Sequence, residues 1–427
     1  MRALLVAILL SVMLTGLAAC ALFSRPTPEP LVPTAPARAL VRPGARPSAT
    51  AVAATRVALL ASATPAPTAT EPPATVTLDP TATEPPATPA AAISPPTATI
   101  APIASPARAA PTLSAASSST WGLPGSPRGR VGVGLPLLGI GSFDWGVAPP
   151  GWYLNWTTQP RPSLRTDVAF APMIRLNGDT FSPTLDQIEA IAAQNPGALW
   201  LVGNEPDVPW QDNATPEQYA ATYGLLYKAI KEADPAARVA IGGVSQPTPL
   251  RLAYLDRILT AYKARYGGEM PVDVWNIHAF ILREERNSWG VGIPPGMPVD
   301  KGTLYEIGNH TDMQIFRGQI EGFRRWMAER GQRNRPLVVT EYGVLMPDDY
   351  GFPPDLVSKF MAATFDYFLS AQDPALGYPA DGNRLVQAFC WYSVADTTYP
   401  TSNLFDAKTR AMTPVGRAFR QYVQALR

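Results

Sequence analysis

The sequence predicts an α/β fold, a (β/α)8 TIM-type barrel with one strand degenerate or hard to locate, behind a disordered Pro/Ala/Thr-rich tether. The chain has 427 residues and 48 prolines, and most of residues 25–116 is Pro, Ala, Thr and Ser. Such a segment buries too little apolar surface to offset the entropy cost of ordering its backbone. Beyond Trp121, short apolar or β-branched runs alternate with longer helical ones, which is typical of parallel βαβ units.

The N-terminus has the features of a secretion signal. Met1-Arg2 precedes an apolar run, and Leu17-Ala18-Ala19-Cys20 resembles the bacterial lipobox. We therefore expect a lipoprotein signal peptide over 1–20, lipidation of Cys20, and an extracytoplasmic protein anchored by that lipid to the bacterial cell membrane. The alternative is an uncleaved transmembrane anchor, since the apolar run extends to Phe23.

Residues 21–120 are predicted to be a linker, and residues 121–427 the barrel domain. The linker repeats one eight-residue motif, at 68–75 and at 81–88. Proline-rich chain favours extended polyproline geometry and acts as a semi-rigid spacer. A spacer suits an enzyme and a binding protein equally well.

Composition argues against several classes of function. The formal net charge is +1, which provides no basic field for nucleic acid. The chain contains two histidines, His278 and His310, two cysteines, Cys20 and Cys390, and no HExxH or CxxC motif. We therefore expect no metal site, no cofactor and no disulfide framework.

The barrel elements follow from the apolar patterning. Strands are expected at 152–156, 171–176, 198–202, 239–243, 272–277, 336–340 and 386–391, with 131–134 as a candidate eighth strand, and helices at 184–194, 216–233, 250–266, 313–330, 354–371 and 414–426. The competing doubly wound sheet lacks its Gly-rich phosphate loop. The C-terminal ends of barrel strands share one mouth, where catalysis takes place.

Two glutamates stand at predicted strand ends. Glu205 lies in Leu201-Val-Gly-Asn-Glu-Pro-Asp207, and Glu341 lies in Val338-Val-Thr-Glu-Tyr-Gly343. Pro206 is expected to keep Glu205 extended. Glycoside hydrolysis needs a proton donor and a second carboxylate across the anomeric carbon, and these two residues could supply both.

These motifs resemble the clan A glycoside hydrolases. Gly203-Asn-Glu-Pro-Asp207, Asn276-Ile-His-Ala-Phe280 and Phe389-Cys-Trp-Tyr392 look closest to the glycosyl hydrolase catalytic-core family, which includes endo-β-1,3-glucanases. The resemblance covers roughly 151–423. Phe280 departs from the family pattern, because many relatives carry Tyr near the end of that strand.

The resemblance implies a role for each matching residue. Glu205 would be the acid/base, and Glu341 the nucleophile. Asn204 would bind the sugar 2-hydroxyl, Arg175 would pair with Glu341, His278 would support the site, Trp391 would floor the sugar subsite, and Tyr342 would contact substrate. Trp152, Trp156, Trp210 and Trp289 are weaker candidates, because most aromatic residues in a barrel pack in the core.

The sequence thus predicts a surface-anchored retaining glycosidase that cleaves a β-linked polysaccharide or oligosaccharide by double displacement. A non-catalytic glycan-binding lipoprotein on a similar barrel is the alternative, and carboxylates more than about 10 Å apart would favour it. A metal-dependent barrel hydrolase is a weaker third idea. The sugar, the linkage, endo or exo cleavage, and the oligomeric state do not follow from the sequence.

Overall fold

A computed structural model describes residues 124–426 of the chain. The predicted signal peptide, the lipidation site Cys20 and the linker over 21–120 lie outside these residues. Among the residues described, no helix combines the length and the apolar character needed to cross a bilayer.

The strands form two hydrogen-bonded sheets. One has the order β3-β2-β1-β10-β9-β8, and the other the order β5-β4-β6-β7. All neighbouring pairs are parallel except β4 and β5, which form a hairpin. The strands are β1 (Val131–Gly134), β2 (Trp152–Leu154), β3 (Ala169–Phe170), β4 (Met173–Asn177), β5 (Thr180–Ser182), β6 (Leu199–Asn204), β7 (Arg238–Gly243), β8 (Trp275–His278), β9 (Leu337–Glu341) and β10 (Ala388–Trp391).

The two sheets are connected along both edges. Parallel bridges join Ala240 to Val274 and Val244 to Ile277, so β7 lies beside β8. On the other side, the N–H of Met173 donates to the carbonyl of Thr157 at 2.9 Å, which places β4 beside the end of β2. Since β3 precedes β4 by only two residues and also pairs with β2, the two are segments of one strand. The eight parallel strands thus follow one another in a ring, consistent with the predicted TIM-type barrel. The candidate strand at 131–134 is β1.

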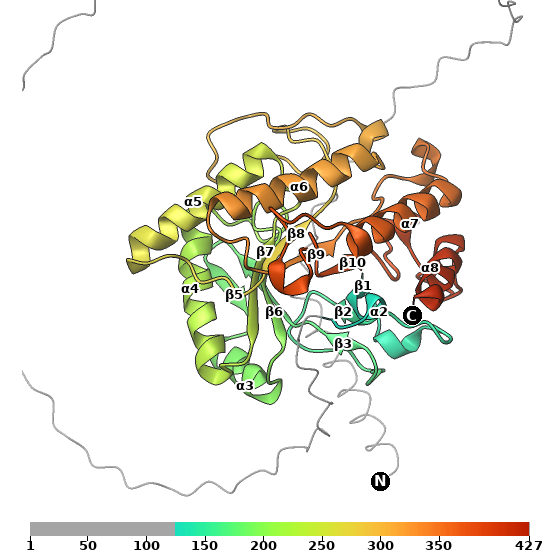
Figure 1. Ribbon diagram of the computed structural model, residues 1–427, viewed down its shortest axis with the longest axis horizontal. Coiled ribbons are helices and arrows are strands. Elements are labelled where there is room, and N and C mark those ends of the chain that lie inside the picture. Colours follow the sequence, from blue (N-terminus) through green and yellow to red (C-terminus); the bar gives the residue numbers. More distant parts are fainter. Residues whose placement is uncertain (1–123, 427) are drawn as a thin grey trace, which may run out of the picture. The chain divides into compact units, whose positions relative to one another are not determined.

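In residues 124–426, six long helices lie outside the strands, as Figure 1 shows. Several begin with proline in the first turn after a threonine. In α4, the Thr215 hydroxyl accepts from the N–H of Gln218 at 3.3 Å. The helices are α2 (Pro127–Arg130), α3 (Leu185–Gln194), α4 (Pro216–Ala233), α5 (Pro249–Tyr266), α6 (Met313–Glu329), α7 (Pro354–Ser370) and α8 (Pro414–Ala425), and the 3-10 turns are η1 (Ile140–Ser142), η2 (Ile307–Asn309), η3 (Asp348–Tyr350), η4 (Pro379–Asp381) and η5 (Pro400–Ser402).

The core has two layers, because alternate strand residues face opposite sides. A cluster that includes Trp152, Met173, Leu201 and Cys390 fills the barrel interior. A larger cluster packs between the strands and the helices. Gly132 is required in the interior, since a Cβ there would lie 2.5 Å from the Cys390 sulfur.

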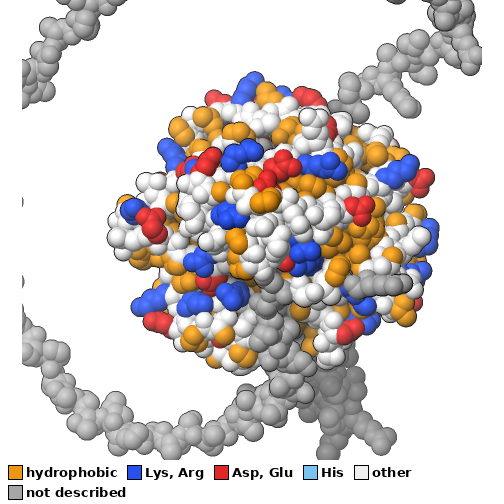
Figure 2. Space-filling model, viewed as in Figure 1, with side chains coloured by type: hydrophobic (Ala, Val, Ile, Leu, Met, Phe, Trp, Pro, Cys, Tyr) orange, Lys and Arg blue, Asp and Glu red, His pale blue; other side chains and the backbone are white. Residues whose placement is uncertain are grey.

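Charges on the surface are mixed in sign. On the face in Figure 2, lysines and arginines alternate with acidic side chains, and apolar side chains lie between them.

Candidate active site

Glu205 and Glu341 meet at one histidine. His278, the last residue of β8, is fully buried. Its Nδ1 lies 3.0 Å from Oε1 of Glu205, and its Nε2 lies 3.4 Å from Oε1 of Glu341. Both glutamates are nearly buried, with 8% and 5% of their surface exposed. The two carboxylates predicted from the sequence therefore converge, and one imidazole ring spans the space between them.

This arrangement limits the separation of the carboxylates. Contacts of 3.0 Å and 3.4 Å lie on the two sides of one five-membered ring. The two Oε1 atoms are consequently no farther apart than the roughly 9.5 Å upper limit for carboxylate pairs in glycosidases. The two carboxylates are therefore closer together than the separation of more than about 10 Å that would favour a binding-only protein.

The backbone at Glu205 differs from the expectation. Pro206 predicts an extended Glu205, but β6 ends at Asn204 and Glu205 has φ +46°. The left-handed region is rarely occupied by residues other than glycine, asparagine and aspartate, and functional sites are where such strain concentrates. The N–H of Glu205 donates to the carbonyl of Gly243 at 3.0 Å, which ties the turn to the end of β7. The turn, rather than strand extension, directs the carboxylate towards His278.

A register shift at the end of β9 explains the direction of Glu341. Ile277 pairs with Val339, but the next residue, His278, pairs with Glu341, so β9 contains one extra residue. A bulge of this kind re-aims the side chains that follow it. Thr340 still faces inwards, where its hydroxyl donates to Oδ1 of Asn276 at 2.8 Å. As a result, Thr340 and Glu341 are both directed to the inside of the barrel.

Trp156 is a direct partner of Glu341. Its indole N–H donates to Oε1 of Glu341 at 2.7 Å, from the loop after β2. Trp156 has φ +56°, and its ring meets that of Tyr392 edge-on at 5.8 Å. Sequence reasoning ranks Trp156 low, because nothing in its pattern distinguishes it from a core aromatic. Its position at a strand end is the signal that could have identified it.

Charge and burial set the protonation of the site. Burial raises the pKa of Glu341 to about 7, against the opposing effects of His278, the Trp156 hydrogen bond and Arg175; the nearby Glu205 adds to the rise. Burial alone would lower the pKa of His278, but the Glu341 charge and the hydrogen bond to Glu205 raise it above its ordinary value. Arg175 is therefore one of several groups that favour the ionised form of Glu341.

Arg175 has a different direct partner from the one predicted. Its Nε donates to Oδ1 of Asp212 at 2.7 Å, and its Nη2 donates to Oε1 of Gln211 at 3.0 Å. Arg175 therefore pairs with Asp212 instead of Glu341, and its effect on Glu341 is a longer-range charge effect. Asn204 lies in the same group: its Nδ2 is 3.5 Å from the Gln211 oxygen, and its buried Oδ1 has no hydrogen-bond partner among the described residues.

The predicted substrate contacts of Trp391 and Tyr342 are wrong. Both side chains are fully buried, and their rings meet at 5.4 Å in the layer between strands and helices. The Trp391 indole N–H donates to the carbonyl of Ser402 at 2.9 Å. On β10, Cys390 faces the barrel interior, so strand alternation turns Trp391 outwards. The bulge in β9 has the same consequence for Tyr342. Neither ring is therefore placed to stack against a sugar in the site.

A buried ion cluster lies behind the loop that carries Glu205. The Arg251 guanidinium donates to Asp207 at 2.6 Å and also contacts Glu284, and all three side chains are 0% exposed. Asp207 further accepts from the hydroxyl of Ser245 at 2.7 Å. Asp207, Ser245 and Glu284 come from the β6–α4, β7–α5 and β8–α6 loops, and Arg251 lies in the first turn of α5, so the cluster joins three loops at the mouth of the barrel. The structure thus gives Asp207 an internal role in this cluster.

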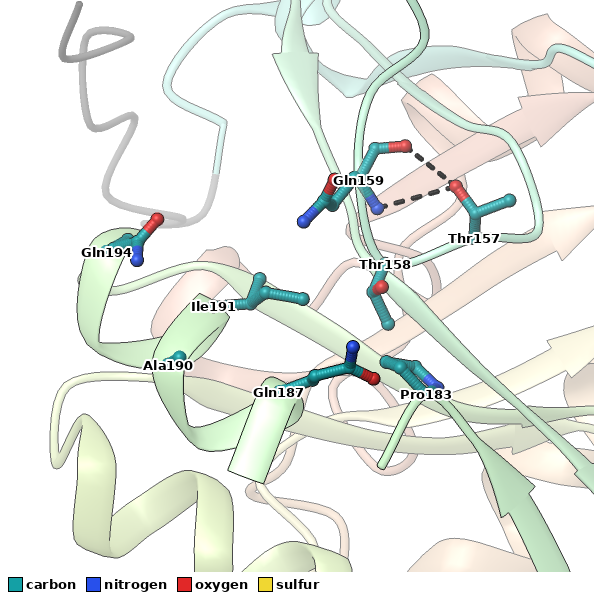
Figure 3. A pocket seen from close by; sticks show the side chains of 8 residues that line it. All are labelled: Thr157, Thr158, Gln159, Pro183, Gln187, Ala190, Ile191 and Gln194. Atoms are coloured by element: carbon teal, nitrogen blue, oxygen red, sulfur yellow. Dashed lines mark hydrogen bonds between the residues drawn. The ribbon is translucent and has the colours of Figure 1, made fainter. Parts of the chain in front are cut away.

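One surface cavity lies near the glutamate pair without containing it. It measures about 470 Å³ and lies between α3 and the loop after β2, as Figure 3 shows. It is lined by Thr157, Thr158, Gln159, Pro183, Gln187, Ala190, Ile191 and Gln194. Thr157 is the residue next to Trp156, so this cavity lies beside the site without forming part of it. Within 124–426, no group of three or more His, Cys, Asp or Glu side chains could hold a metal ion.

Comparisons with known proteins agree with the motifs. Residues 146–291 match the family described as "Glycosyl hydrolase catalytic core", which confirms the predicted resemblance. No curated protein matches the chain significantly.

Several solved structures are similar over most of the described residues. A GH128 subgroup II endo-β-1,3-glucanase from Sorangium cellulosum is 17% identical, covers 69% of this chain and 98% of its own, and has a TM-score of 0.47. The subgroup II enzyme from Pseudomonas viridiflava is 18% identical, with coverage of 68% and 96% and a TM-score of 0.45. A subgroup III curdlan-specific exo-β-1,3-glucanase from Blastomyces gilchristii is 18% identical, with coverage of 69% and 99% and a TM-score of 0.47.

Proposed function

We propose that this chain is a glycoside hydrolase that cleaves a β-linked glucan or related polysaccharide by double displacement, with Glu205 as acid/base and Glu341 as nucleophile. The observation that carries the proposal is the contact of both carboxylates with His278, at 3.0 and 3.4 Å. Two carboxylates within the glycosidase range at the mouth of a barrel are what glycoside hydrolysis requires. The match of residues 146–291 to a glycosyl hydrolase family supports the reaction class.

In the first step, the carboxylate of Glu341 attacks the anomeric carbon while the carboxyl of Glu205 donates its proton to the glycosidic oxygen. The bond between that carbon and the leaving oxygen breaks, and a glycosyl ester forms on Glu341. The Trp156 indole N–H and His278 both contact Oε1 of Glu341, so they favour the ionised form that attacks.

In the second step, Glu205 takes a proton from water, and the water oxygen attacks the anomeric carbon. The ester bond breaks and Glu341 regains its charge. The His278 contact to Glu205 holds that carboxyl in place through both steps. The unpaired Oδ1 of Asn204 is available to accept from a sugar hydroxyl, and Arg175 lies with it around Gln211.

The test is turnover by the full-length protein on a panel of β-1,3-glucan, mixed-linkage β-glucan, cellulose and xylan. We expect reducing sugar from one class of polymer. Glu205→Gln and Glu341→Gln should each lower the rate by at least about a hundredfold, whereas Glu217→Gln, an exposed glutamate on α4, should not. Binding of a glycan without any turnover would instead favour the non-catalytic alternative.

Anchoring through a lipid on Cys20 is part of the same proposal, and it rests on the lipobox-like sequence alone. Metabolic labelling with a fatty acid should mark the wild type and not Cys20→Ser. A membrane-bound but unlabelled wild type would favour the transmembrane anchor.

A further inference from the structure

Trp210 is an exposed aromatic residue close to the acid/base. It follows Glu205 by five positions, in the loop between β6 and α4, and 49% of its surface is exposed. It is the most exposed tryptophan among residues 124–426. Leaving a large indole in water forgoes the free energy of burying it, so its position calls for a physical reason.

The turn that carries Trp210 is held on both sides. The N–H of Val208 donates to the carbonyl of Glu205 at 3.0 Å, and the N–H of Gln211 donates to the carbonyl of Val208 at 3.0 Å. Val208 is fully buried in the small apolar cluster that contains Phe280 and Leu282. On the far side, the buried carboxylate of Asp212 accepts from the N–H groups of Leu176 and Asn204, at 3.0 and 2.6 Å. The backbone beneath the indole is thereby fixed.

The ring itself rests against the long loop after β8. A Cβ on Gly292 would lie 3.3 Å from Cη2 and Cζ3 of Trp210, and Gly292 has φ +61°. Arg251 holds this segment, since its Nη2 donates to the carbonyls of Val291 and Gly292 at 3.2 and 3.4 Å. Gly292 therefore allows the indole edge to approach the backbone, while part of the ring stays open to solvent.

The neighbour of Trp210 joins it to the candidate active site. The Gln211 side-chain oxygen accepts from Arg175 at 3.0 Å and lies 3.5 Å from Nδ2 of Asn204. One short turn thus carries a polar group into the site and an indole out to the rim of the barrel mouth. Sugar rings combine hydroxyl groups with an apolar C–H face, and the indole offers a flat apolar surface with one N–H donor for such a ring.

From this geometry we infer that Trp210 is a distal sugar-binding platform of the active site, on which a pyranose ring of the glycan stacks several units away from the cleaved bond. The inference rests on the proposed function and deepens it. It implies that the preferred substrate is a glycan chain long enough to reach from the cleaved bond to Trp210. It also identifies Gly292 as the residue against which the Trp210 ring packs.

The experiment compares full-length wild type, Trp210→Ala, Trp210→Tyr and Leu225→Ala on laminaritriose and laminarihexaose. Leu225 is the matched control, an apolar residue on α4 that is 44% exposed. We expect Trp210→Ala to lower kcat/KM for the hexaose by about tenfold, mainly through KM, and to leave the triose within about twofold. Trp210→Tyr should retain part of the effect, and Leu225→Ala should match the wild type.

A second readout is independent of turnover: retardation of the same proteins in native gels that contain laminarin. We expect Trp210→Ala to be retarded less than the wild type and Leu225→Ala to be retarded equally. Equal losses on both oligosaccharides, or no change in either readout, would overturn the platform. A wild type that is retarded by laminarin in a Trp210-dependent manner but cleaves nothing would uphold the platform and overturn the proposed catalysis. A wild type that neither cleaves nor binds laminarin or any other polymer of the panel would overturn both.

Discussion

The indole N–H of Trp156 donates a 2.7 Å hydrogen bond to Oε1 of Glu341, across 185 positions of sequence. The same oxygen faces His278 at 3.4 Å. Two groups from different strand ends therefore stabilise the charge of a buried carboxylate whose burial opposes ionisation. The balance between burial and these two contacts sets the pH at which Glu341 ionises, and with it the pH at which the proposed nucleophile is available.

Removing the donor should raise the pKa of Glu341. Trp156→Phe keeps an aromatic ring but deletes the N–H, so the ionised form loses one hydrogen bond. We expect the acidic limb of kcat/KM to move upwards by about one to two pH units, because a hydrogen bond to a charged group contributes roughly 1.5–3 kcal/mol. Trp289→Phe, a half-buried tryptophan in the apolar cluster near Phe280, is the control and should leave the limb in place. An unshifted limb in Trp156→Phe would mean that the indole does not stabilise the Glu341 charge.

The wild type should lose activity as the pH falls below neutrality. The proposed nucleophile Glu341 would attack only when ionised, and its pKa is raised to about 7, so kcat/KM should rise with pH through that value. A pH–rate profile under conditions where the protein stays folded measures the midpoint. A midpoint near 4.5, the ordinary value for glutamate, would show that burial does not control this carboxylate.

Gly243 should be essential for placing His278. A Cβ at this position would lie 2.5 Å from Cδ2 and 2.7 Å from Nε2 of the imidazole. Gly243→Ala should therefore displace the ring from between the carboxylates and lower kcat/KM by about a hundredfold, the cost of a misplacement of roughly 1 Å. Gly268→Ala, which has open space around its Cβ, is the control. Full activity of Gly243→Ala would mean that the ring position is not critical.

The buried ion cluster should dominate the stability of the loops at the mouth. Arg251→Met leaves the carboxylates of Asp207 and Glu284 buried without their cation, and we expect a loss of about 3–5 kcal/mol in the free energy of unfolding. Chemical denaturation measures the change. Lys228→Met breaks an exposed pair with Glu232, whose side chains are 73% and 67% exposed, and should change stability by less than about 1 kcal/mol. Similar effects for the two variants would contradict the role of the cluster.

Much of the fold could be predicted from the sequence because its signals are local. Apolar patterning predicted α4 at Pro216–Ala233 without error, and apolar runs located the barrel strands to within a few residues. Glu205 and Glu341 were predicted because each follows a buried strand, and strand ends share one side of the sheet.

The errors arose where side-chain direction depends on backbone detail. Side chains along a strand alternate between its two faces, and the extra residue in β9 shifts that alternation so that Glu341 faces inwards and Tyr342 outwards. No residue pattern in the sequence marks this bulge. The left-handed backbone at Trp156 and Glu205 turns both side chains towards the site, against the ordinary preference of these residue types. Arg175 pairs with Asp212 and Gln211, which follow it by 37 and 36 positions. Local sequence patterns do not describe contacts between residues so far apart.

The stereochemistry of the first product decides whether Glu341 is the nucleophile. Proton NMR during hydrolysis of the best polysaccharide from the panel shows which anomer appears before mutarotation. Double displacement through Glu341 predicts that the β-anomer is released first. Release of the α-anomer first would mean single displacement by water and would contradict the assignment of Glu341 as the nucleophile.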